Sequence, residues 1–588
     1  MSDNQVGEVF ESTPNFIIVI IKTHEVFDKH KIDLQIGKYL KIQQGNNDFI
    51  VAQIQNVKSG QYPILDHQNI CFYLSTRPIG MIDNEGNFSR GSIILPVPTE
   101  PVFLLSDKST EKIYFQNKDM NYYLGRLLHN KTTKYYLNGN RFFSKHIAIV
   151  GSTGSGKSCA VARIIQNAIG INKNKNENLQ EQKNSHIIIF DIHSEYAHAF
   201  NLPSDEKFNL NLLNVDNLAL PYWLMNADEL ESLFIESQEQ NSHNQISIFK
   251  QAVIKNKEKH NSGMHITYDT PAFFDINEVV NYIKNMNNEV LSKLTDSMNQ
   301  PKLSNGSFID RKSYFDEEYD FAENSSARAD KASSGPFKGE FDRFILRLET
   351  RLNDKRLSFL LDPQKGDEAK YSTSDFSSIV QQFIGYINKS NVSVIDLSGI
   401  PFEVLSIVIS LVSRIVFDFC FHYSKLRHAK DEKNDIPILL VCEEAHNYVP
   451  RSGGAEYNAS RHSIERIAKE GRKYGISLMI VSQRPSEVSE TIFAQCNNFI
   501  ALRLNNDNDQ SYIKSLLPEN DSGVADILPN LGLGEALVVG DAALLPSLVK
   551  LEKPEPEPKS ESIEVYDEWL CSWKTPTFDD VIERWRKW

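Results

Sequence analysis

The residues with the clearest chemical meaning form one short segment, Gly151–Ser158, which reads GSTGSGKS. It fits the pattern G-x-x-x-x-G-K-[ST] of a phosphate-binding loop, and it stands between a predicted strand, His146–Val150, and a predicted helix, Cys159–Ala168. Glycines let backbone N–H groups approach phosphate, Lys157 places a positive charge on the β- and γ-phosphates, and Ser158 offers a hydroxyl to Mg²⁺. We therefore expect ATP and Mg²⁺ as cofactors. The candidate nucleotide-binding residues are Gly151, Ser152, Thr153, Gly154, Ser155, Gly156, Lys157, Ser158 and Cys159.

A second motif is the apolar run Ile438–Cys442, which predicts a strand and is followed by two acids, Glu443 and Glu444. Buried strands often end in acids at the rim of a sheet, but after a phosphate-binding loop this pattern is typical of ATP hydrolysis. We assign Glu443, together with Ser158, to the metal, and Glu444 to water activation as the general base. Asp is commoner at the first position, and Glu is one methylene longer, so the geometry at the metal stays open.

Two further positions fit a site for the γ-phosphate. The run Ile476–Ser482 predicts a strand, and Gln483 at its tip is a candidate sensor, the alternative being a glutamine that only caps the strand. The preceding helix carries Arg466, Lys469 and Arg472. Most such side chains are simply solvated, but one arginine could reach the γ-phosphate of a neighbouring subunit.

Polar residues also follow the predicted strand His186–Phe190. Asp191, His193 and Glu195 lie at its carboxyl end, the edge at which open α/β sheets bind ligands. A separate metal site with His198 is the less favoured interpretation, because no second cluster matches it. We expect these residues to cap a helix or to support the nucleotide site.

Composition and charge limit the class of protein. The chain has 588 residues, which predicts roughly two to four units, and 40% of them are hydrophobic, enough for a substantial core. The net charge of −14 argues against coating nucleic acid with the whole surface, although a ring could have a basic pore. The six cysteines lack C-x-x-C spacing and indicate structural thiols in a reducing compartment. We find neither a signal peptide nor a window of about 18 apolar residues, so we expect a cytoplasmic protein with no membrane span.

The distribution of apolar runs predicts an N-terminal β domain before an α/β core. Short runs such as Phe16–Ile21, Phe49–Ile54 and Ile93–Val97 favour a small barrel or sandwich that serves in assembly or docking. From about residue 120, strands alternate with helices, which predicts a mainly parallel sheet. Besides those already named, the predicted core strands are Ser393–Leu397, Phe499–Leu504 and Glu535–Gly540.

Polar, helix-rich sequence interrupts the core between residues 200 and about 385. Five apolar residues from Phe341 to Leu352 share one face of a predicted helix, whereas Asn305–Gly335 and Ile171–Ser185 are predicted to be loops, the former mobile. The expected domains are therefore 1–118 (barrel), 119–200 (core), 201–385 (helical insertion), 386–550 (core) and 551–588 (linker and docking segment).

The C-terminal segment combines a proline-rich stretch with aromatic residues. Glu552–Pro558 predicts a stiff linker. Four of the five tryptophans lie beyond it, namely Trp569, Trp573, Trp585 and Trp588. This much aromatic surface predicts docking, either on the chain's own core or on a neighbouring subunit or partner.

Taken together, the ordered motifs resemble the HerA family, which belongs with the FtsK-type translocases. The strings that carry the resemblance are His146–Ser158, Asp191–Tyr196, Glu443–His446, Glu470–Gly475 and Ser482–Pro485. The N-terminal β region, beginning near Val6–Val9, is similar to the HerA barrel domain.

The resemblance implies a RecA-like P-loop ATPase core in a homohexameric ring, with ATP bound between subunits and hydrolysis coupled to translocation on double-stranded DNA. Arg472 matches the position expected to act in trans, which completes a candidate catalytic set of Lys157, Glu444, Gln483 and Arg472. HerA-like proteins act with a nuclease of the NurA type, and bacterial relatives pair with anti-phage effectors such as sirtuin-like NADases and nucleases. Glu443 and the divergent insertion depart from the family pattern.

Three functions remain open at this stage. The leading hypothesis is a hexameric DNA translocase that drives or feeds a nuclease, with Arg451, Arg461 and Arg466 as weak pore candidates. The second is an ATP-regulated scaffold that assembles and activates an anti-phage effector, which the acidic surface and the β domain favour slightly. The third is a protein- or conjugation-coupling ATPase, against which the missing membrane anchor counts.

Overall fold

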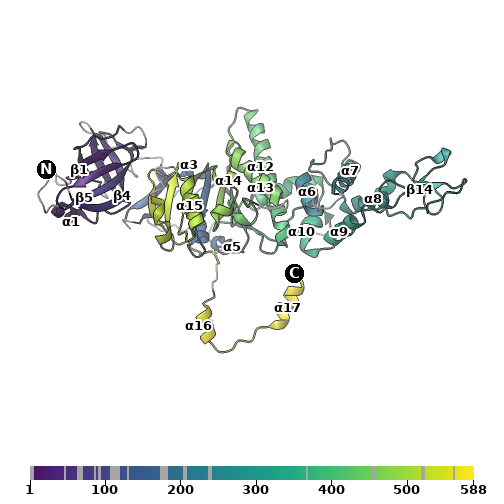
Figure 1. Cartoon of the computed structure of the whole chain (residues 1–588). Helices are drawn as coiled ribbons and strands as arrows, with labels where there is room; N and C mark the ends of the chain where they lie inside the picture. The colour runs from purple at the N-terminus through teal and green to yellow at the C-terminus, as the bar shows by residue number, and fades with distance from the viewer. Residues whose placement is uncertain are drawn as a thin grey trace. The chain divides into compact units, whose positions relative to one another are not determined.

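The computed structural model describes residues 5–44, 48–61, 70–84, 88–90, 94–105, 120–128, 132–171, 183–202, 208–235, 242–365, 369–452, 457–517, 524–559 and 563–587. The chain divides into two compact units, and Figure 1 labels the main helices and strands along it. Unit 1 contains residues 1–210, 420–452 and 465–559, and unit 2 contains residues 211–419, 453–464 and 560–588.

The N-terminal part of unit 1 is a closed barrel. Its elements are β1 (Gln5–Ser12), β2 (Ile17–Ile21), α1 (His24–His30), β3 (Tyr39–Gln44), β4 (Asp48–Gln61), β5 (Ile70–Ile82), β6 (Phe88–Arg90) and β7 (Pro101–Leu104). The strand order is β2-β1-β7-β3-β4-β5-β6, and an additional β2–β5 pairing closes a ring of six strands. Alternating residues such as Val19, Ile42 and Ile54 point inward to a common core. The predicted barrel is confirmed.

One predicted strand of this region was wrong. Residues 94–97 of the run Ile93–Val97 have no regular structure. Pro96 and Pro98 explain the difference, because each removes a backbone donor that a strand would need.

The core of unit 1 is a mixed sheet. Its strands are β8 (Met120–Leu127), β9 (Lys134–Asn138), β10 (His146–Val150), β11 (His186–Asp191), β18 (Ile438–Cys442), β19 (Ile476–Ser482), β20 (Cys496–Ala501), β21 (Glu535–Gly540) and β22 (Ser547–Leu551). Their order is β11-β18-β19-β10-β20-β21-β22-β8-β9, in which the first five are parallel and the remaining pairings are antiparallel. The α/β fold and every motif-bearing strand are confirmed, whereas the antiparallel extension was not predicted.

Short helices connect and cover these strands. In unit 1 they include α3 (Gly139–Phe143), α4 (Lys157–Ile169), α5 (Tyr196–Phe200), η6 (Ala445–Asn447), η8 (Gly471–Tyr474), α14 (Glu490–Phe493) and α15 (Asp507–Leu516). A further helix, α13 (Asn458–Glu470), leads into η8. The helix α4 starts after Gly156 and ends at Gly170, and both glycines have positive φ angles, 96° and 81°.

The proline-rich stretch that the sequence predicts as a stiff linker is held against the core of unit 1. Residues Glu552–Lys559, which we call the strap, lie along α4 and α5. Gln166 donates a hydrogen bond to the carbonyl of Pro556 (2.9 Å) and accepts one from the N–H of Glu555 (3.0 Å). The N–H of the last strap residue donates to the carbonyl of Glu195 (2.9 Å). Proline has no N–H, so the strap does not pair as a β-strand. Its backbone carbonyls are therefore available to accept hydrogen bonds from neighbouring side chains.

The segment beyond the strap forms two short helices, α16 (Val565–Leu570) and α17 (Phe578–Lys587). Every residue from 563 to 586 is exposed, including Trp569, Trp573 and Trp585. The expected docking of this segment, on the chain's own core or on a neighbouring subunit or partner, stays a prediction.

Unit 2 is mainly helical. Its elements include β12 (Leu210–Leu213), α6 (Ala227–Phe234), α7 (Ser242–His260), α8 (Ile276–Asn288), β13 (Val290–Ser292), β14 (Ala332–Ser334), α9 (Asp342–Leu352), β15 (Gln364–Lys365), β16 (Ala369–Lys370), α11 (Phe376–Phe383), β17 (Val392–Asp396) and most of α12 (Phe402–His428). The amphipathic helix predicted around Phe344 and Leu348 is confirmed as α9, and both residues are buried. The five strands β12 to β16 are short, with at most four residues each.

The segment Asn305–Gly335 is likewise more regular than predicted. Its strand β14 pairs with β13, and Arg311 forms a bidentate ion pair with the buried Glu289 (2.9 and 2.7 Å). Tyr314 donates to the same carboxylate (3.0 Å). These contacts order a polar sequence that composition alone marks as a loop. Most of the other predicted loop, residues 172–182, lies outside the described residues.

One helix contradicts the expectation about apolar windows. Within the described residues, α12 is long and apolar enough to cross a membrane by length and composition, but 78% of its most apolar window is buried inside the protein. Core helices that are covered on all sides are apolar all round for the same reason.

Candidate nucleotide-binding site

The site begins with the loop between β10 and α4. Gly154 and Gly156 adopt positive φ angles of 72° and 96°, which L side chains rarely tolerate. A Cβ on Gly151 would lie 2.5 Å from the Ser155 hydroxyl and 2.9 Å from the Leu502 side chain. The backbone conformation of the loop therefore requires glycine at these positions, in addition to any requirement set by phosphate binding.

The loop has the properties of an anion site. Helix α4 begins at Lys157, with no acidic residue in its first turn, so its free N–H groups favour negative charge. Lys157 is buried, with 7% of its surface exposed. The buried Ser155 hydroxyl has no hydrogen-bond partner within the described part of the chain. These groups fit the phosphates of a nucleoside triphosphate, and Ser158 and Cys159 continue the first turn of α4 beside them.

The first acid of the site is Glu443, directly after β18. It is buried, and the Tyr196 hydroxyl donates a hydrogen bond to its Oε2 (2.7 Å). The pKa of Glu443 is raised to about 8, mainly by burial and also by the charges of Glu444 and Asp191, while the Tyr196 hydrogen bond and Lys157 act in the opposite direction. A carboxyl group in this position fits a divalent cation, whose charge would offset the cost of ionising it.

Glu444 has an unusual backbone. Its φ and ψ angles are 46° and 47°, the left-handed region that is costly for a residue with a Cβ. The side chain is nine-tenths buried, and its Oε2 lies 3.3 Å from Nδ1 of His446. Strain of this kind persists where the surrounding structure fixes the residue, and it is common at functional sites.

Asp191 positions Tyr196 from the neighbouring strand. Its carboxylate accepts hydrogen bonds from the N–H groups of His193 (3.3 Å), Glu195 (3.1 Å) and Tyr196 (2.8 Å) at the start of α5. These contacts satisfy N–H groups at the start of α5, which is one of the two roles expected from the sequence. No metal-binding group of three or more His, Cys, Asp or Glu side chains occurs among the described residues, and His198 instead contacts the strap.

Gln483 reaches the phosphate-binding loop. The Thr153 hydroxyl donates to its Oε1 at 2.5 Å. The preceding residue, Ser482, pairs with Val150 across β19 and β10, and its carbonyl accepts the N–H of Gly151 (3.3 Å). The structure thus brings Lys157, Glu443, Glu444 and Gln483 to the carboxyl edge of the same parallel strands.

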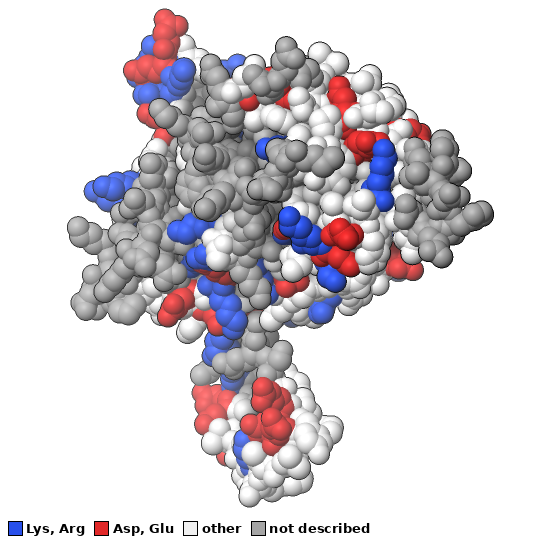
Figure 2. Space-filling view, turned by 90° about the vertical axis from the view of Figure 1, so that its left-hand side faces the viewer, with Lys and Arg blue, Asp and Glu red and all other residues white. Residues whose placement is uncertain are grey.

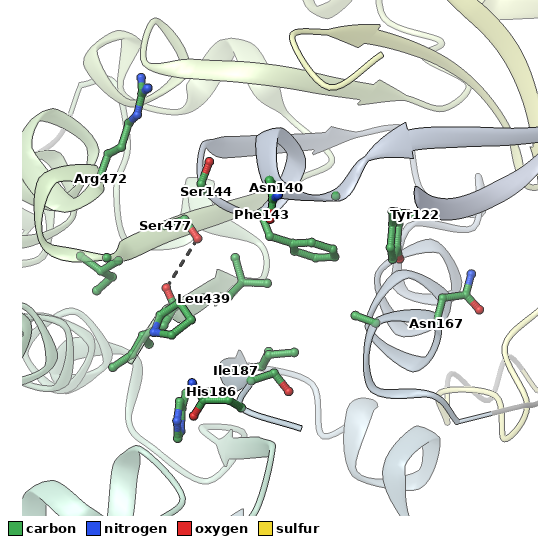
Figure 3. A pocket seen from close by; sticks show the side chains of 18 of the residues that line it. Tyr122, Asn140, Phe143, Ser144, Asn167, His186, Ile187, Leu439, Arg472 and Ser477 are labelled. Carbon is green, nitrogen blue, oxygen red and sulfur yellow. Dashed lines mark hydrogen bonds between the residues drawn. The ribbon is translucent and has the colours of Figure 1, made fainter. Parts of the chain in front are cut away.

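Arg472 lies at the other edge. It follows α13, just before β19 begins, and it lines a cavity of about 520 Å³ with Pro437 and Ser477, which stand at the amino ends of β18 and β19. Figure 3 shows its side chain extending away from the other labelled lining residues. The seven residues of β19 span about 20 Å, so Arg472 is not brought to the nucleotide site of its own chain.

Two polar residues of the site were not assigned from sequence. Tyr196 and His446 both fall within motif strings that we had singled out, but neither had a role. Their contacts depend on which strands are neighbours, and spacing along the chain does not reveal strand order.

The parallel sheet, the phosphate-binding loop after β10 and the two acids at the end of β18 define a P-loop ATPase. A family model described as "Helicase HerA, central domain" matches residues 122–332. The chain is also similar to the DNA double-strand break repair helicase HerA of Pyrococcus furiosus, with 26% identity over 77% of this chain and 72% of the relative. The protein of the same name from Saccharolobus solfataricus is 24% identical over 94% of this chain and 95% of the relative. The chain is thus similar to the HerA-type P-loop ATPases over most of its length.

Two solved structures are similar over much of the chain. VirB4 of Thermoanaerobacter pseudethanolicus matches with a TM-score of 0.40 and 15% identity, covering 74% of this chain and 97% of that one. The plasmid coupling protein TrwB in complex with ADP and Mg²⁺ matches with a TM-score of 0.40 and 14% identity, covering 70% and 86%.

Proposed function

We propose that this ATPase is a homohexameric motor that translocates on double-stranded DNA and works with a nuclease, such as a NurA-like one, or an anti-phage effector. The names of the two HerA relatives, which describe repair of DNA double-strand breaks, support the DNA substrate. The observation that carries the proposal is the division of the catalytic residues between the two edges of the sheet. We place the activity in the cytoplasm, which the six free cysteines support.

In this proposal the carboxyl edge binds and hydrolyses ATP. The N–H groups of the loop and the Lys157 ammonium hold the phosphates. Ser158 and Glu443 would hold Mg²⁺, which supplies charge neutralisation at the β- and γ-phosphates when bound. Glu444 accepts a proton from the attacking water, and Gln483 lies on the side of the γ-phosphate, next to Thr153.

Arg472 acts on the nucleotide of a neighbouring subunit. Its distance from its own loop leaves it free to face another molecule, and a guanidinium that stabilises the charge of the transferring phosphoryl group is a common way to complete such sites. Repeating this contact from subunit to subunit generates a ring.

Contacts with DNA are expected inside such a ring rather than over the whole surface. Figure 2 shows Lys and Arg side chains interspersed with Asp and Glu on the face it presents, with no broad area of one sign among the residues described there. Of the three pore candidates, Arg451 forms an ion pair with Glu490, which makes it a weaker candidate for contact with DNA. Phosphate contacts in a pore would make DNA binding weaken with salt.

The test is the ATPase rate of the purified chain with and without linear double-stranded DNA, at two salt concentrations. The proposal predicts a DNA-stimulated rate that falls as salt rises. Lys157→Ala is the matched control, because it should abolish both basal and stimulated rates. Equal rates with and without DNA, alone and with the protein encoded beside it in the genome, would contradict the translocase.

A second function is favoured by the exposed aromatic segment. Residues 563–587 leave Trp569, Trp573 and Trp585 without burial in this chain, which suits assembly with an effector such as a sirtuin-like NADase or a nuclease. In that case the ring is an ATP-regulated scaffold for anti-phage defence, and DNA movement is secondary. Activation of the partner by ATP in the absence of DNA would favour the scaffold over the motor.

A further inference from the structure

We propose that His446 is a positioning residue for hydrolysis, which links the orientation of Glu444 to the end of β19 where Gln483 faces the phosphate-binding loop. The inference rests on the proposed role of Glu444 as the general base, and it adds a residue to which no role has been assigned.

The ring of His446 stands between two buried groups. Its Nδ1 lies 3.3 Å from Oε2 of Glu444 and 3.2 Å from the hydroxyl of Ser482. The side chains of His446 and Glu444 are both 9% exposed, and Ser482 is fully buried. The imidazole therefore joins the end of β18 to the end of β19 through side chains, in addition to the backbone pairing of the two strands.

Glu444 needs such a partner. Within the described part of the chain, its buried Oε2 makes no hydrogen bond, and the polar group that stands against it is the His446 ring, with Nδ1 at 3.3 Å. Its left-handed backbone sets the direction of the Cβ, but the remaining side-chain torsions are free to move the carboxylate. A general base must lie within hydrogen-bond reach of the water that it deprotonates, so the carboxylate requires a fixed orientation.

The other side of the ring leads to the nucleotide. The Ser482 hydroxyl accepts the N–H of Arg484 (3.0 Å), and the carbonyl of Ser482 accepts the N–H of Gly151. Gln483, between these residues, accepts the Thr153 hydroxyl. If the loop shifts when the γ-phosphate binds, Ser482 would therefore move with it, and the contact of Ser482 with the His446 ring would change.

The charge of the ring suits this role. Burial lowers the pKa of His446, while Glu444 and Glu487 raise it and Arg484 and Lys157 lower it. A neutral imidazole can orient the carboxylate through one N–H, whereas an imidazolium would form a full ion pair and weaken Glu444 as a base. Positioning, and not proton transfer, is the function that the contacts describe.

The experiment compares His446→Leu with His446→Asn, whose amide N–H can replace Nδ1–H. We expect kcat for ATP to fall on the order of 10- to 100-fold in the leucine variant, with KM and ATP affinity unchanged. The asparagine variant should recover most of this loss. Asn447→Ala is the neighbouring control and should keep the wild-type kcat.

Three outcomes separate this inference from the proposed function. If Glu444→Gln keeps wild-type turnover, the general base is wrong and the inference falls with it. If Glu444→Gln is inactive but His446→Leu keeps the wild-type kcat, only the inference is overturned. If His446→Leu does not fold, Ser482→Ala decides, since it cuts the same link. A drop in kcat of about tenfold with KM unchanged supports positioning, and wild-type kcat contradicts it.

Discussion

The two ends of the parallel strands β10, β18 and β19 carry different chemistry. At the carboxyl edge, Glu443, Glu444 and Asp191 are all buried around one lysine, Lys157. Such a group of acids is costly to ionise until a cation joins it. The carboxyl edge therefore has more buried acids than cations and needs an additional cation to balance them.

The amino edge has the opposite character. His146 at the start of β10 donates from Nε2 to the carbonyl of Ala468 (2.9 Å) and accepts the N–H of Leu478 at Nδ1 (3.0 Å). Burial lowers the pKa of this imidazole, and the charge of Arg472 lowers it further. The histidine is accordingly neutral, and the exposed Arg472 adds a positive charge at this edge. The proposed function uses this difference, because Arg472 of one chain would complete the hydrolytic site of another.

The largest expected effect comes from removing the cation of the amino edge. Arg472→Ala should lower kcat by about 10³-fold or more, because an arginine that acts in trans stabilises the transition state and contributes little to ATP binding. Lys473→Ala, the adjacent cation, is the control and should hydrolyse normally. The rate is measured by phosphate release. An Arg472→Ala rate within a fewfold of wild type would mean that Arg472 of one subunit does not act at the nucleotide site of the next.

The next effect concerns the general base at the carboxyl edge. Glu444→Gln should lower kcat by about 10²- to 10⁴-fold while ATP binding and ring formation persist, since the amide keeps the shape but cannot accept the proton. Binding can be followed with a fluorescent ATP analogue, and assembly by light scattering. Wild-type turnover in this variant would remove Glu444 from its role.

A third prediction concerns the stability of the metal-free protein. Glu443 has a folded-state pKa of about 8, above its ordinary value, so the folded state keeps a proton that the unfolded state loses as pH rises from about 4.5 to 8. Wild-type stability should therefore decrease over this range by on the order of a few kcal/mol. Glu443→Gln should remove that decrease.

The measurement is the unfolding midpoint in urea with a chelator, at pH 5 and pH 9. The two proteins should be similar at pH 5, and the variant should be the more stable at pH 9. A wild type that gains stability toward pH 9 relative to the variant would contradict the assigned cause.

The smallest effect tests the backbone strain. Asn tolerates the left-handed region better than Glu, so Glu444→Asn should raise the free energy of unfolding by about 1 kcal/mol while abolishing hydrolysis. Thermal unfolding of this variant beside Glu444→Gln, which keeps the strain, isolates the backbone contribution. Equal midpoints for the two variants would show that the strain is not significant.

The sequence was sufficient for the parts of the site that are contiguous. The phosphate-binding loop, Glu443, Glu444 and Gln483 each follow a predicted strand, and parallel strands present such positions at one edge. The contacts of Tyr196 and His446 were not predictable, because they require β11 beside β18 and β18 beside β19. The order of these strands is set by packing of the whole sheet, and no short sequence pattern indicates it.

The failures in the fold have equally specific causes. The strap was interpreted as a linker because its composition is polar and proline-rich, yet it is held through backbone carbonyls, which any sequence possesses. Asn305–Gly335 owes its order to Glu289, a residue outside the segment. The helix α12 is apolar on all sides because it is buried, and a window of hydropathy does not distinguish that from a membrane span.

The most direct test of the divided site is a structure of the assembled Glu444→Gln protein with ATP and Mg²⁺. The account predicts that the Arg472 guanidinium of one subunit lies about 3 Å from the γ-phosphate held by Lys157 of the next. Arg472 far from every bound nucleotide would contradict it.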